Sequence, residues 1–311
     1  MSAAVVIVKV GTSSITGPGG ELDEGALAKL AADLVAARAA GHRPVLVMSG
    51  AIAAGMPALG FERRPTDMGT LQALAAVGQP RLVARLGELL APAGVVAGQV
   101  LLTPYDFLHR SQYLHARETL DRLLDLGVLP VVNENDTVAD DEIRYGDNDR
   151  LAALVAHMLG AELLLMLTDT AGVFTADPRL DRDASLIEEI VEVDQALEAV
   201  AGGAGSERGS GGMASKLAAA KIAAWSGARA VIAAASVEGV IVDAIAGRSV
   251  GTAFAPRPLR LSSRKLWIAF ARASADRIVV EWPSGRTDDF RSTKSGSYQL
   301  TEGGRLTLKT L

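Results

Sequence analysis

Short apolar runs recur along most of the chain, separated by segments with helical periodicity. The runs are apolar and often β-branched on consecutive positions, which is typical of strands buried on both faces of a parallel sheet. The strand-like runs are residues 5–8, 44–48, 95–102, 128–132, 163–167 and 230–235. Between the first two, residues 23–40 place Leu27, Leu30 and Leu34 on one helical face, with Asp23 as the N-cap and Gly41 after the last turn.

Further helices are predicted from Ser111 to Gly127, from about Asp149, and after the strand at residues 230–235. Alternating strands and helices indicate an α/β domain with a mostly parallel central sheet sandwiched by helices. Gly251, Thr252 and the Pro256/Pro258 pair are interpreted as a linker that follows the last strand of this domain.

The C-terminal tail differs from the rest of the chain. It contains strand-like pieces at residues 277–282, 298–301 and 306–308, and Gly303 and Gly304 form a pair typical of a hairpin turn. About 50 residues with few large apolar side chains make a marginal independent core. The sequence thus predicts a main domain of residues 1–256 and a small β-rich tail of residues 257–311, which is either partly disordered or packed on the main domain.

Polar side chains stand at the ends of four predicted strands. These are Lys9, Ser49, the group at residues 133–136, and the pair Thr168 and Asp169. In a parallel sheet all four strand ends meet at one edge, where ligands bind in α/β folds. The segment at residues 128–149 is especially dense in amides and carboxylates and ends at a helix start, although Asn, Asp and Gly are also ordinary turn residues.

A glycine-rich stretch at residues 202–212 leads into a predicted helix with Lys216 in its first turn. Backbone N–H groups at such a helix start, together with a lysine, form an anion site, although a flexible loop followed by a helix also fits. The chain lacks both a G-x-x-x-x-G-K-[ST] motif and a G-x-G-x-x-G motif after its first strand. Two lysines facing an Asn/Asp loop suit phosphoryl transfer, in which carboxylates orient the lysines and hold Mg²⁺.

Composition narrows the function classes. With a net charge of −5 and scattered Lys and Arg residues, we expect no nucleic-acid partner. There is no cysteine, which excludes thiolate metal sites, and the four histidines are too dispersed for a metal-ligand motif, so no residue is assigned as a metal ligand. The N-terminal apolar run is short and lacks a basic region, which favours a strand over a signal peptide. No apolar run reaches the roughly 18 residues that span a bilayer, so we expect a cytoplasmic protein without membrane contact.

Six segments of the chain closely resemble the glutamate 5-kinases of the amino-acid kinase superfamily. They are VVIVKVGTSSIT (5–16), VMSGAIAAGM (47–56), LAAVGQPRL (74–82), VLPVVNENDTVADDEIRYGDND (128–149), LTDTAGVFTADPR (167–179) and GSGGMASKLAAAKIA (209–223). The resemblance implies the amino-acid kinase fold for residues 1–256. It also implies transfer of the ATP γ-phosphate to the side-chain carboxylate of L-glutamate, the first step of proline biosynthesis, with ATP and Mg²⁺ as cofactors.

The resemblance also implies roles for individual residues. Catalysis would depend on Lys9, Lys216 and Asp149, with Asp149 organising the two lysines. L-Glutamate would bind to Ser49, Asp136 and Asn148. The nucleotide-binding positions would be Lys9, Thr168, Asp169, Ser210, Gly211, Gly212, Met213, Ala214, Ser215 and Lys216. The family usually has Thr where this chain has Ser210, and the hydroxyl is kept.

Many glutamate 5-kinases carry a C-terminal PUA domain, an RNA-binding type of β fold, whereas the tail here resembles a truncated or divergent form of it. The resemblance further implies a dimer or tetramer and feedback inhibition by L-proline. Two alternatives stay open. One is another member of the superfamily, such as an acetylglutamate, aspartate or UMP kinase. The other is a non-catalytic regulatory protein on the same scaffold.

Overall fold

A computed structural model describes residues 3–17, 21–138, 148–178, 180–191 and 212–257, together with the backbone of four short strands between residues 277 and 309. The chain divides into two compact units, Met1–Arg260 and Leu261–Leu311. Each unit is described by itself.

The described elements alternate in type through the first unit. In the first half they are β1 (Val5–Val10), η1 (Thr12–Ser14), α1 (Glu24–Ala39), β2 (Arg43–Met48), α2 (Ala51–Gly55), η2 (Pro57–Leu59), α3 (Met68–Leu90), η3 (Ala91–Ala93), β3 (Ala97–Leu102), α4 (Pro104–Leu108) and α5 (Arg110–Asp125). In the second half they are β4 (Leu129–Glu134), η4 (Asp136–Val138), α6 (Asn148–Leu159), β5 (Leu163–Thr168), β6 (Glu189–Ile190), α8 (Met213–Trp225), β7 (Arg229–Ala234), α9 (Val240–Ile245) and β8 (Gly251–Phe254).

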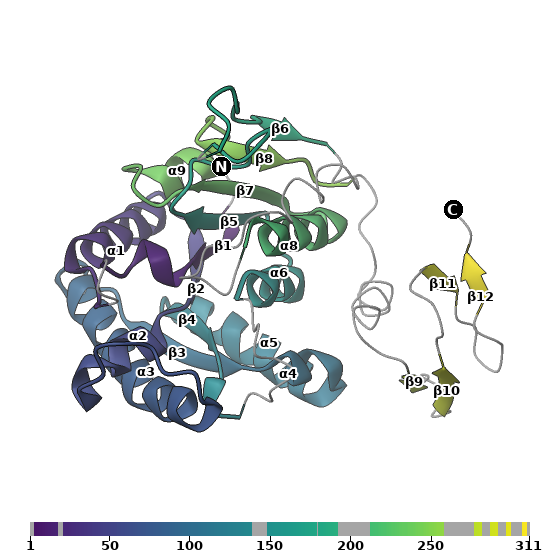
Figure 1. Ribbon diagram of the computed structural model, residues 1–311, viewed down its shortest axis with the longest axis horizontal. Helices are drawn as coiled ribbons and strands as arrows, with labels where there is room; N and C mark the ends of the chain where they lie inside the picture. Colours follow the sequence, from purple (N-terminus) through teal and green to yellow (C-terminus); the bar gives the residue numbers. More distant parts are fainter. Residues whose placement is uncertain are drawn as a thin grey trace. The chain divides into compact units, whose positions relative to one another are not determined.

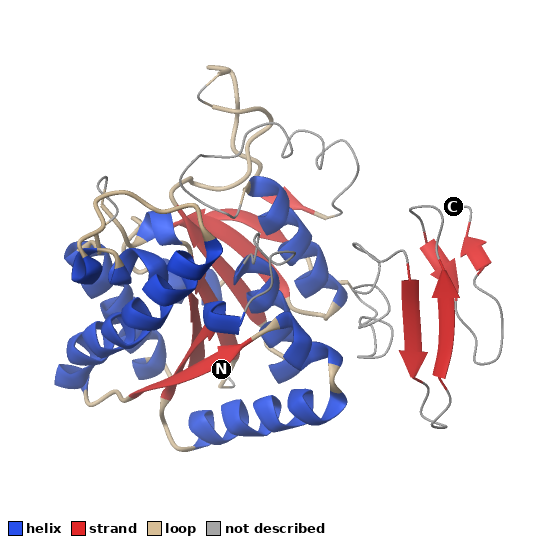
Figure 2. Cartoon of the chain, turned by 60° about the horizontal axis from the view of Figure 1, so that its bottom comes forward, coloured by secondary structure: helices blue, strands red, loops and turns tan. Residues whose placement is uncertain are grey.

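Eight strands of the described chain form one sheet in the order β3-β4-β2-β1-β5-β7-β8-β6. Neighbouring strands are parallel except for β7 and β8, which are antiparallel. Helices cover both faces of the sheet (Figures 1 and 2). The mostly parallel α/β architecture predicted from the sequence is therefore confirmed. The strand order reverses around β1, and ligands of such folds bind beyond the carboxyl ends of the strands at that point.

Successive strand residues point to opposite faces and build two separate cores. In β1, Val6, Val8 and Val10 join a core with α1, α3 and α9, whereas Ile7 joins the other core with α5, α6 and α8. Both faces of the strand are buried, which explains why its sequence is continuously apolar. The same alternation assigns Lys9 to the face of Ile7, next to α6 and α8.

The first predicted helix is confirmed in detail. Asp23 is its N-cap, and its carboxylate accepts a 3.0 Å hydrogen bond from the Ala26 N–H group. Leu27 and Leu30 are buried on its inner face. Gly41 lies beyond its end with a φ of +86°, a left-handed conformation that favours glycine.

Several assignments in the first unit differ from the sequence analysis. Residues Asn133 and Glu134 were predicted to lie in a loop, but they continue β4 and pair with Leu101 and Leu102 of β3. The polar sequence is typical of a loop, but here it belongs to the end of a strand at the edge of the sheet where ligands bind in such folds. The long helix α3 and the short strand β6 were not predicted.

Gly251 and Thr252 were interpreted as a linker, but they lie in strand β8. Gly251 allows a close approach, because a Cβ there would lie 2.1 Å from the Ile232 carbonyl oxygen. The buried Thr252 hydroxyl accepts a 2.8 Å hydrogen bond from the Val173 N–H group and donates a 2.6 Å bond to the Ile187 carbonyl. A small residue and a satisfied hydroxyl are thus compatible with an inner strand.

The second unit contains two antiparallel strand pairs among its described residues. Strand β9 (Arg277–Glu281) pairs with β10 (Thr287–Arg291), and β11 (Ser297–Gln299) pairs with β12 (Thr307–Lys309). Strands β9, β11 and β12 coincide closely with the predicted strand-like pieces, whereas β10 was not predicted. The predicted turn at Gly303 and Gly304 lies outside the described residues.

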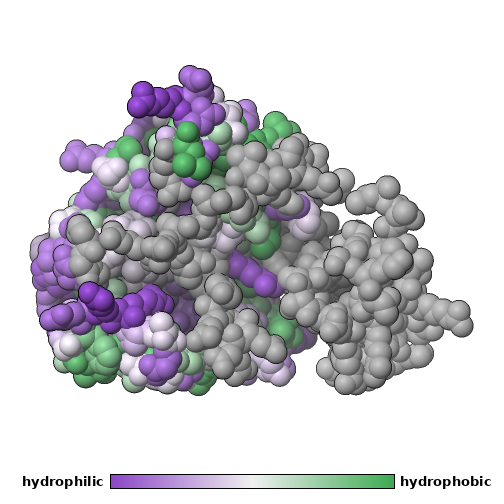
Figure 3. Space-filling model, in the orientation of Figure 1, coloured by the Kyte–Doolittle hydropathy of each residue, from purple (hydrophilic) through white to green (hydrophobic). Residues whose placement is uncertain are grey.

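Among the described residues, no helix is long and apolar enough to cross a membrane. On the face drawn in Figure 3, hydrophobic residues form small separate areas between hydrophilic ones. Scattered exposed apolar residues are normal on folded proteins and do not by themselves mark a binding site.

Candidate active site

The polar strand ends meet at one edge of the sheet, as the parallel arrangement predicts. Lys9 is the next-to-last residue of β1, Ser49 follows β2 directly, and Thr168 is the last residue of β5. Strand β4 ends at Glu134 beside them. The first turn of α6 reaches the same edge and carries Asn148 and Asp149.

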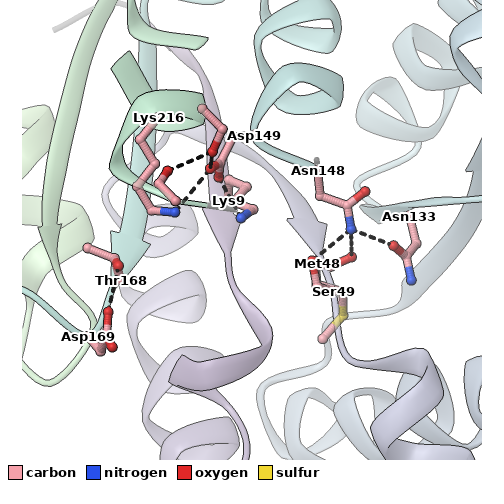
Figure 4. A network of polar contacts seen from close by, with 11 residues as sticks. Lys9, Met48, Ser49, Asn133, Asn148, Asp149, Thr168, Asp169 and Lys216 are labelled. Atoms are coloured by element: carbon pink, nitrogen blue, oxygen red, sulfur yellow. Dashed lines mark hydrogen bonds and ion pairs between the residues drawn. The ribbon is translucent and has the colours of Figure 1, made fainter. Parts of the chain in front are cut away.

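Asp149 lies between two lysines that come from distant parts of the chain. Its Oδ1 atom is 2.5 Å from Lys9 Nζ, and its Oδ2 atom is 3.0 Å from Lys216 Nζ. The Ser215 hydroxyl also donates a 3.0 Å hydrogen bond to Oδ2. Figure 4 shows Asp149 with Lys9 and Lys216 on either side of its carboxylate. Helix α6 thus supplies one carboxylate that holds a lysine from β1 and a lysine from α8 in fixed positions.

Burial makes this ion triplet energetically important. Asp149 is fully buried, and Lys9 and Lys216 are only 3% and 6% exposed. Burial by itself raises the pKa of Asp149, but the two ammonium charges outweigh it and lower the pKa to about 2. The carboxylate therefore stays ionised at neutral pH. One negative charge then faces two positive charges, and the site keeps an excess positive charge for an anionic ligand.

Asn148 organises a second, uncharged cluster beside the lysines. Its Nδ2 group lies within hydrogen-bond distance of the Met48 carbonyl (3.0 Å), Ser49 Oγ (2.8 Å) and Asn133 Oδ1 (2.9 Å), and its two hydrogens are shared among these three acceptors. Figure 4 shows that the adjacent residues Asn148 and Asp149 point in different directions, one to the amide cluster and one to the lysines. Two successive residues of α6 thereby fix the distance between the cationic cluster and the amide cluster.

Asp136 lies just beyond β4, in the short helix η4. Burial raises the pKa of its carboxyl group to about 6, and the positive charge of Arg64 only partly opposes this effect. A cationic ligand group placed next to this carboxylate would favour its ionised form. The residue is therefore suited to bind an ammonium group near neutral pH.

The predicted nucleotide-binding residues are only partly described. The Thr168 hydroxyl donates a 3.0 Å hydrogen bond to the exposed Asp169 carboxylate. Gly212 is the N-cap of α8, and Met213, Ala214 and Ser215 form the first turn of that helix with Lys216. Ser210 and Gly211 lie outside the described residues.

Two buried residues of the site were missing from the predicted set. Asn133 was noted as part of the polar group after β4 but received no role, and Gln79 was not considered. Asn133 Nδ2 donates a 2.7 Å hydrogen bond to Gln79 Oε1. The signal for Gln79 was its polarity within a helical stripe that otherwise contains Leu74, Leu82 and Leu86.

The described residues contain no group of three or more His, Cys, Asp or Glu side chains that could hold a metal ion. What the site presents is a pair of fixed lysines, a helix start beside one of them, and an amide cluster next to a carboxylate. Such an arrangement can neutralise a multiply charged anion at one end and bind a polar, zwitterionic molecule at the other.

Comparison with known proteins assigns this site to a family. Residues 4–234 match the model of the Amino acid kinase family. The chain belongs to the amino acid kinase family. A glutamate 5-kinase of Herminiimonas arsenicoxydans is 49% identical over 280 residues, which cover 90% of this chain and 75% of that protein. A glutamate 5-kinase of Bifidobacterium longum (strain DJO10A) is 46% identical over 308 residues, which cover 99% of this chain and 77% of that protein.

Solved structures of amino acid kinase fold resemble the chain at much lower sequence identity. UMP kinase from Ureaplasma parvum superposes with a TM-score of 0.56 at 14% identity and covers 82% of this chain and 100% of that one. Carbamate kinase from Giardia lamblia bound to AMP-PNP superposes with a TM-score of 0.59 at 19% identity and covers 82% of this chain and 99% of that one. At these identities the likeness concerns the fold alone.

Proposed function

We propose that this protein transfers the γ-phosphoryl group of ATP to the side-chain carboxylate of L-glutamate and forms L-glutamyl 5-phosphate, the first step of proline biosynthesis. The observation that carries the proposal is the pair of buried lysines held by Asp149 directly beside the Asn148 cluster. Similarity to glutamate 5-kinases of 49% and 46% identity supports the choice of substrate.

The chemistry explains why the site contains lysines rather than a general base. The side-chain carboxylate of glutamate has an ordinary pKa of about 4.3, so it is already an ionised nucleophile at neutral pH. One of its oxygens forms a bond to the γ-phosphorus while the bond from that phosphorus to the bridging oxygen breaks, and ADP leaves. The obstacle is repulsion between two anions, and Lys9 and Lys216 offset it as charge spreads over the transferring group.

The second half of the site would recognise the amino-acid end of the substrate. Asp136 is proposed to pair with the α-ammonium group of glutamate. This pairing explains why a site for a substrate with two carboxylates contains a carboxylate of its own. Ser49 and Asn148 would contact the remaining polar groups. Because these residues act on binding more than on the transferring phosphoryl group, their loss should affect the KM for glutamate more than kcat.

The nucleotide would lie toward α8. We propose that Thr168, Asp169 and the segment from residue 210 to Lys216 contact it, because the N–H groups at the start of α8 and the two lysines favour phosphate. Mg²⁺ would arrive with ATP and be held mainly by phosphate oxygens and water, as this ion prefers. When bound, it neutralises charge on the β- and γ-phosphates.

Further properties belong to the same proposal. Residues 1–256 would form the catalytic domain, and the tail of residues 257–311 would not be required for phosphoryl transfer, because every proposed site residue precedes it. A cytoplasmic location, a dimeric or tetrameric state and inhibition by L-proline are proposed from the relationship to glutamate 5-kinases.

The test is an ATP-dependent assay with Mg²⁺ and hydroxylamine, in which an acyl phosphate is trapped as a hydroxamate. L-Glutamate, N-acetyl-L-glutamate, L-aspartate and UMP are compared, and ADP release is followed in parallel. Hydroxamate from L-glutamate alone is expected. Product from another acid, or ADP release with UMP alone, would keep the kinase fold and overturn the substrate, whereas no turnover with any of the four would favour a non-catalytic scaffold.

A further inference from the structure

Helix α3 violates the ordinary preferences of a helix at three successive positions in its middle. Gly78 is a poor helix former, and Pro80 has no N–H group to donate to the carbonyl of Ala76. Between them, Gln79 places an amide in a buried position of the apolar face, where it is 7% exposed. Local conflicts of this kind are expected where a protein gives up stability for function.

The two glycines of the contact between α2 and α3 explain how Gln79 reaches the site. A Cβ on Gly78 would lie 1.7 Å from the Ala51 carbonyl oxygen, and a Cβ on Gly55 would lie 2.1 Å from the Leu74 carbonyl oxygen. The backbones of α2 and α3 therefore approach each other directly. This approach brings Gln79 to the end of β4, where Asn133 lies on the same face of the sheet as Val131 and α3.

Backbone groups identify which atom of each asparagine amide in the cluster is the oxygen and which is the nitrogen. The Met48 carbonyl only accepts, so Asn148 must present its Nδ2 group there. The Glu134 N–H group only donates, and it bonds to Asn133 Oδ1 at 2.9 Å, the same atom that accepts from Asn148. Asn133 is left with its Nδ2 group facing α3, and Gln79 Oε1 is its acceptor at 2.7 Å.

We propose that Gln79 is a positioning residue for the substrate pocket: it holds the Asn133 amide in the orientation that aligns Asn148. The inference rests on the proposed role of Asn148 in binding L-glutamate. With Nδ2 of Asn148 fully engaged, its Oδ1 atom is buried without a partner among the described residues and remains available to accept a hydrogen bond. In Figure 4 the dashed lines of this side chain start at its nitrogen, and none reaches the oxygen. A rotated amide would present N–H groups in its place.

The test compares three variants of Gln79 in the full-length protein. Gln79→Met keeps the length and removes the acceptor. Gln79→Glu keeps both the length and an acceptor oxygen. Gln79→Asn keeps the amide but is one methylene too short, and it replaces the methionine variant if that variant does not fold. Gln112→Met is the control for the chemical change, because it makes the same substitution at an exposed position of α5.

Steady-state kinetics with glutamate and with ATP distinguish positioning from a merely structural role. Loss of the acceptor is expected to raise the KM for L-glutamate about 10-fold, with kcat and the KM for ATP changed by less than about 3-fold. Gln79→Glu should stay within about 3-fold of the wild-type protein in all three constants, as should Gln112→Met.

Equal constants for Gln79→Met and the wild-type protein, or equal losses in Gln79→Met and Gln79→Glu, would overturn the inference and leave the proposed function intact. A uniform fall in kcat without a rise in the KM for glutamate would overturn it as well. A wild-type protein that phosphorylates no glutamate would overturn the proposed function and the inference together.

Discussion

Replacing Asp149 with Asn tests the central feature of the site, the buried carboxylate shared by two lysines. Asparagine has almost the same shape, but it offers only one acceptor oxygen and turns two N–H donors toward the second ammonium group. The variant therefore leaves at least one buried positive charge without an anion. In the wild-type protein the carboxylate oxygens lie 2.5 Å from Lys9 Nζ and 3.0 Å from Lys216 Nζ.

The expected loss follows from burial. Breaking a buried ion pair by removing one partner typically costs about 3–5 kcal/mol. The lysines lower the pKa of Asp149 from 3.8 to about 2 in spite of its burial, so the folded protein favours the ionised carboxylate, in agreement with a destabilising substitution. Asp125→Asn is the matched control. Its carboxylate lies 2.6 Å from Arg43, but the side chains of Arg43 and Asp125 are 34% and 58% exposed, so we expect a loss of at most about 1 kcal/mol.

Urea unfolding followed by circular dichroism measures both variants. The pH dependence supplies a second signature. A carboxyl group whose pKa is lower in the folded state stabilises the protein above its unfolded pKa, and this contribution disappears as the pH falls from about 4 to about 2. The difference between the wild-type protein and Asp149→Asn should therefore be largest at neutral pH and shrink across that window.

The activity of the variant should also fall, because Lys9 and Lys216 would no longer be held in their positions. We expect kcat of Asp149→Asn to decrease by about 100-fold, because misplacing a charge-stabilising group by about 1 Å costs that much. The KM for ATP should not increase, since the variant has one more net positive charge facing the phosphates. A variant as stable and as active as Asp125→Asn would refute the idea that Asp149 organises the two lysines.

Three further predictions concern other parts of the site. Lys9→Ala and Lys216→Ala should each lower kcat by about 100-fold or more, and near-normal kcat in both variants would exclude them as catalytic residues. Because burial raises the pKa of Asp136 to about 6, the KM for L-glutamate should rise as the pH falls below about 6. Asp136→Asn should have a high KM that no longer varies with pH between about 5 and 8, and a persisting pH dependence in that variant would assign it to another group. Gly78→Ala should destabilise the protein by at least about 3 kcal/mol in urea unfolding because its Cβ would meet the Ala51 carbonyl, whereas Gly87→Ala, in the same helix with nothing within 4 Å, should stabilise it by up to about 1 kcal/mol.

The sequence was sufficient for the elements whose signals are local. Strands β1, β2, β4, β5 and β7 were predicted because a strand buried on both faces must be apolar at every position. Helix α1 was predicted with both of its ends, because its N-cap and its terminal glycine are chemical signals within the segment itself. The convergence of polar strand ends followed from the parallel order of strands alone.

Local pattern was misleading wherever a tertiary contact replaced the ordinary signal. Gly251 and Thr252 resemble a linker, yet a close backbone approach and a satisfied hydroxyl place them in β8. Asn133 and Glu134 resemble a loop, yet their backbone still pairs with β3. In both places the polar or small residues are accommodated by partners far away in the sequence, which periodicity along the chain does not reveal.

The sequence by itself determined the fold class, and the family resemblance suggested the chemistry and most residues of the proposed site. Only the tertiary structure showed how these residues are coupled. Lys9 and Lys216 are separated by more than 200 positions in the sequence, yet they share one carboxylate because β1, α6 and α8 meet at the same edge of the sheet. The contact between Gln79 and Asn133 exists because two glycines let α3 approach α2. Such contacts depend on the relative placement of helices and strands, and that placement is decided by packing across the whole domain.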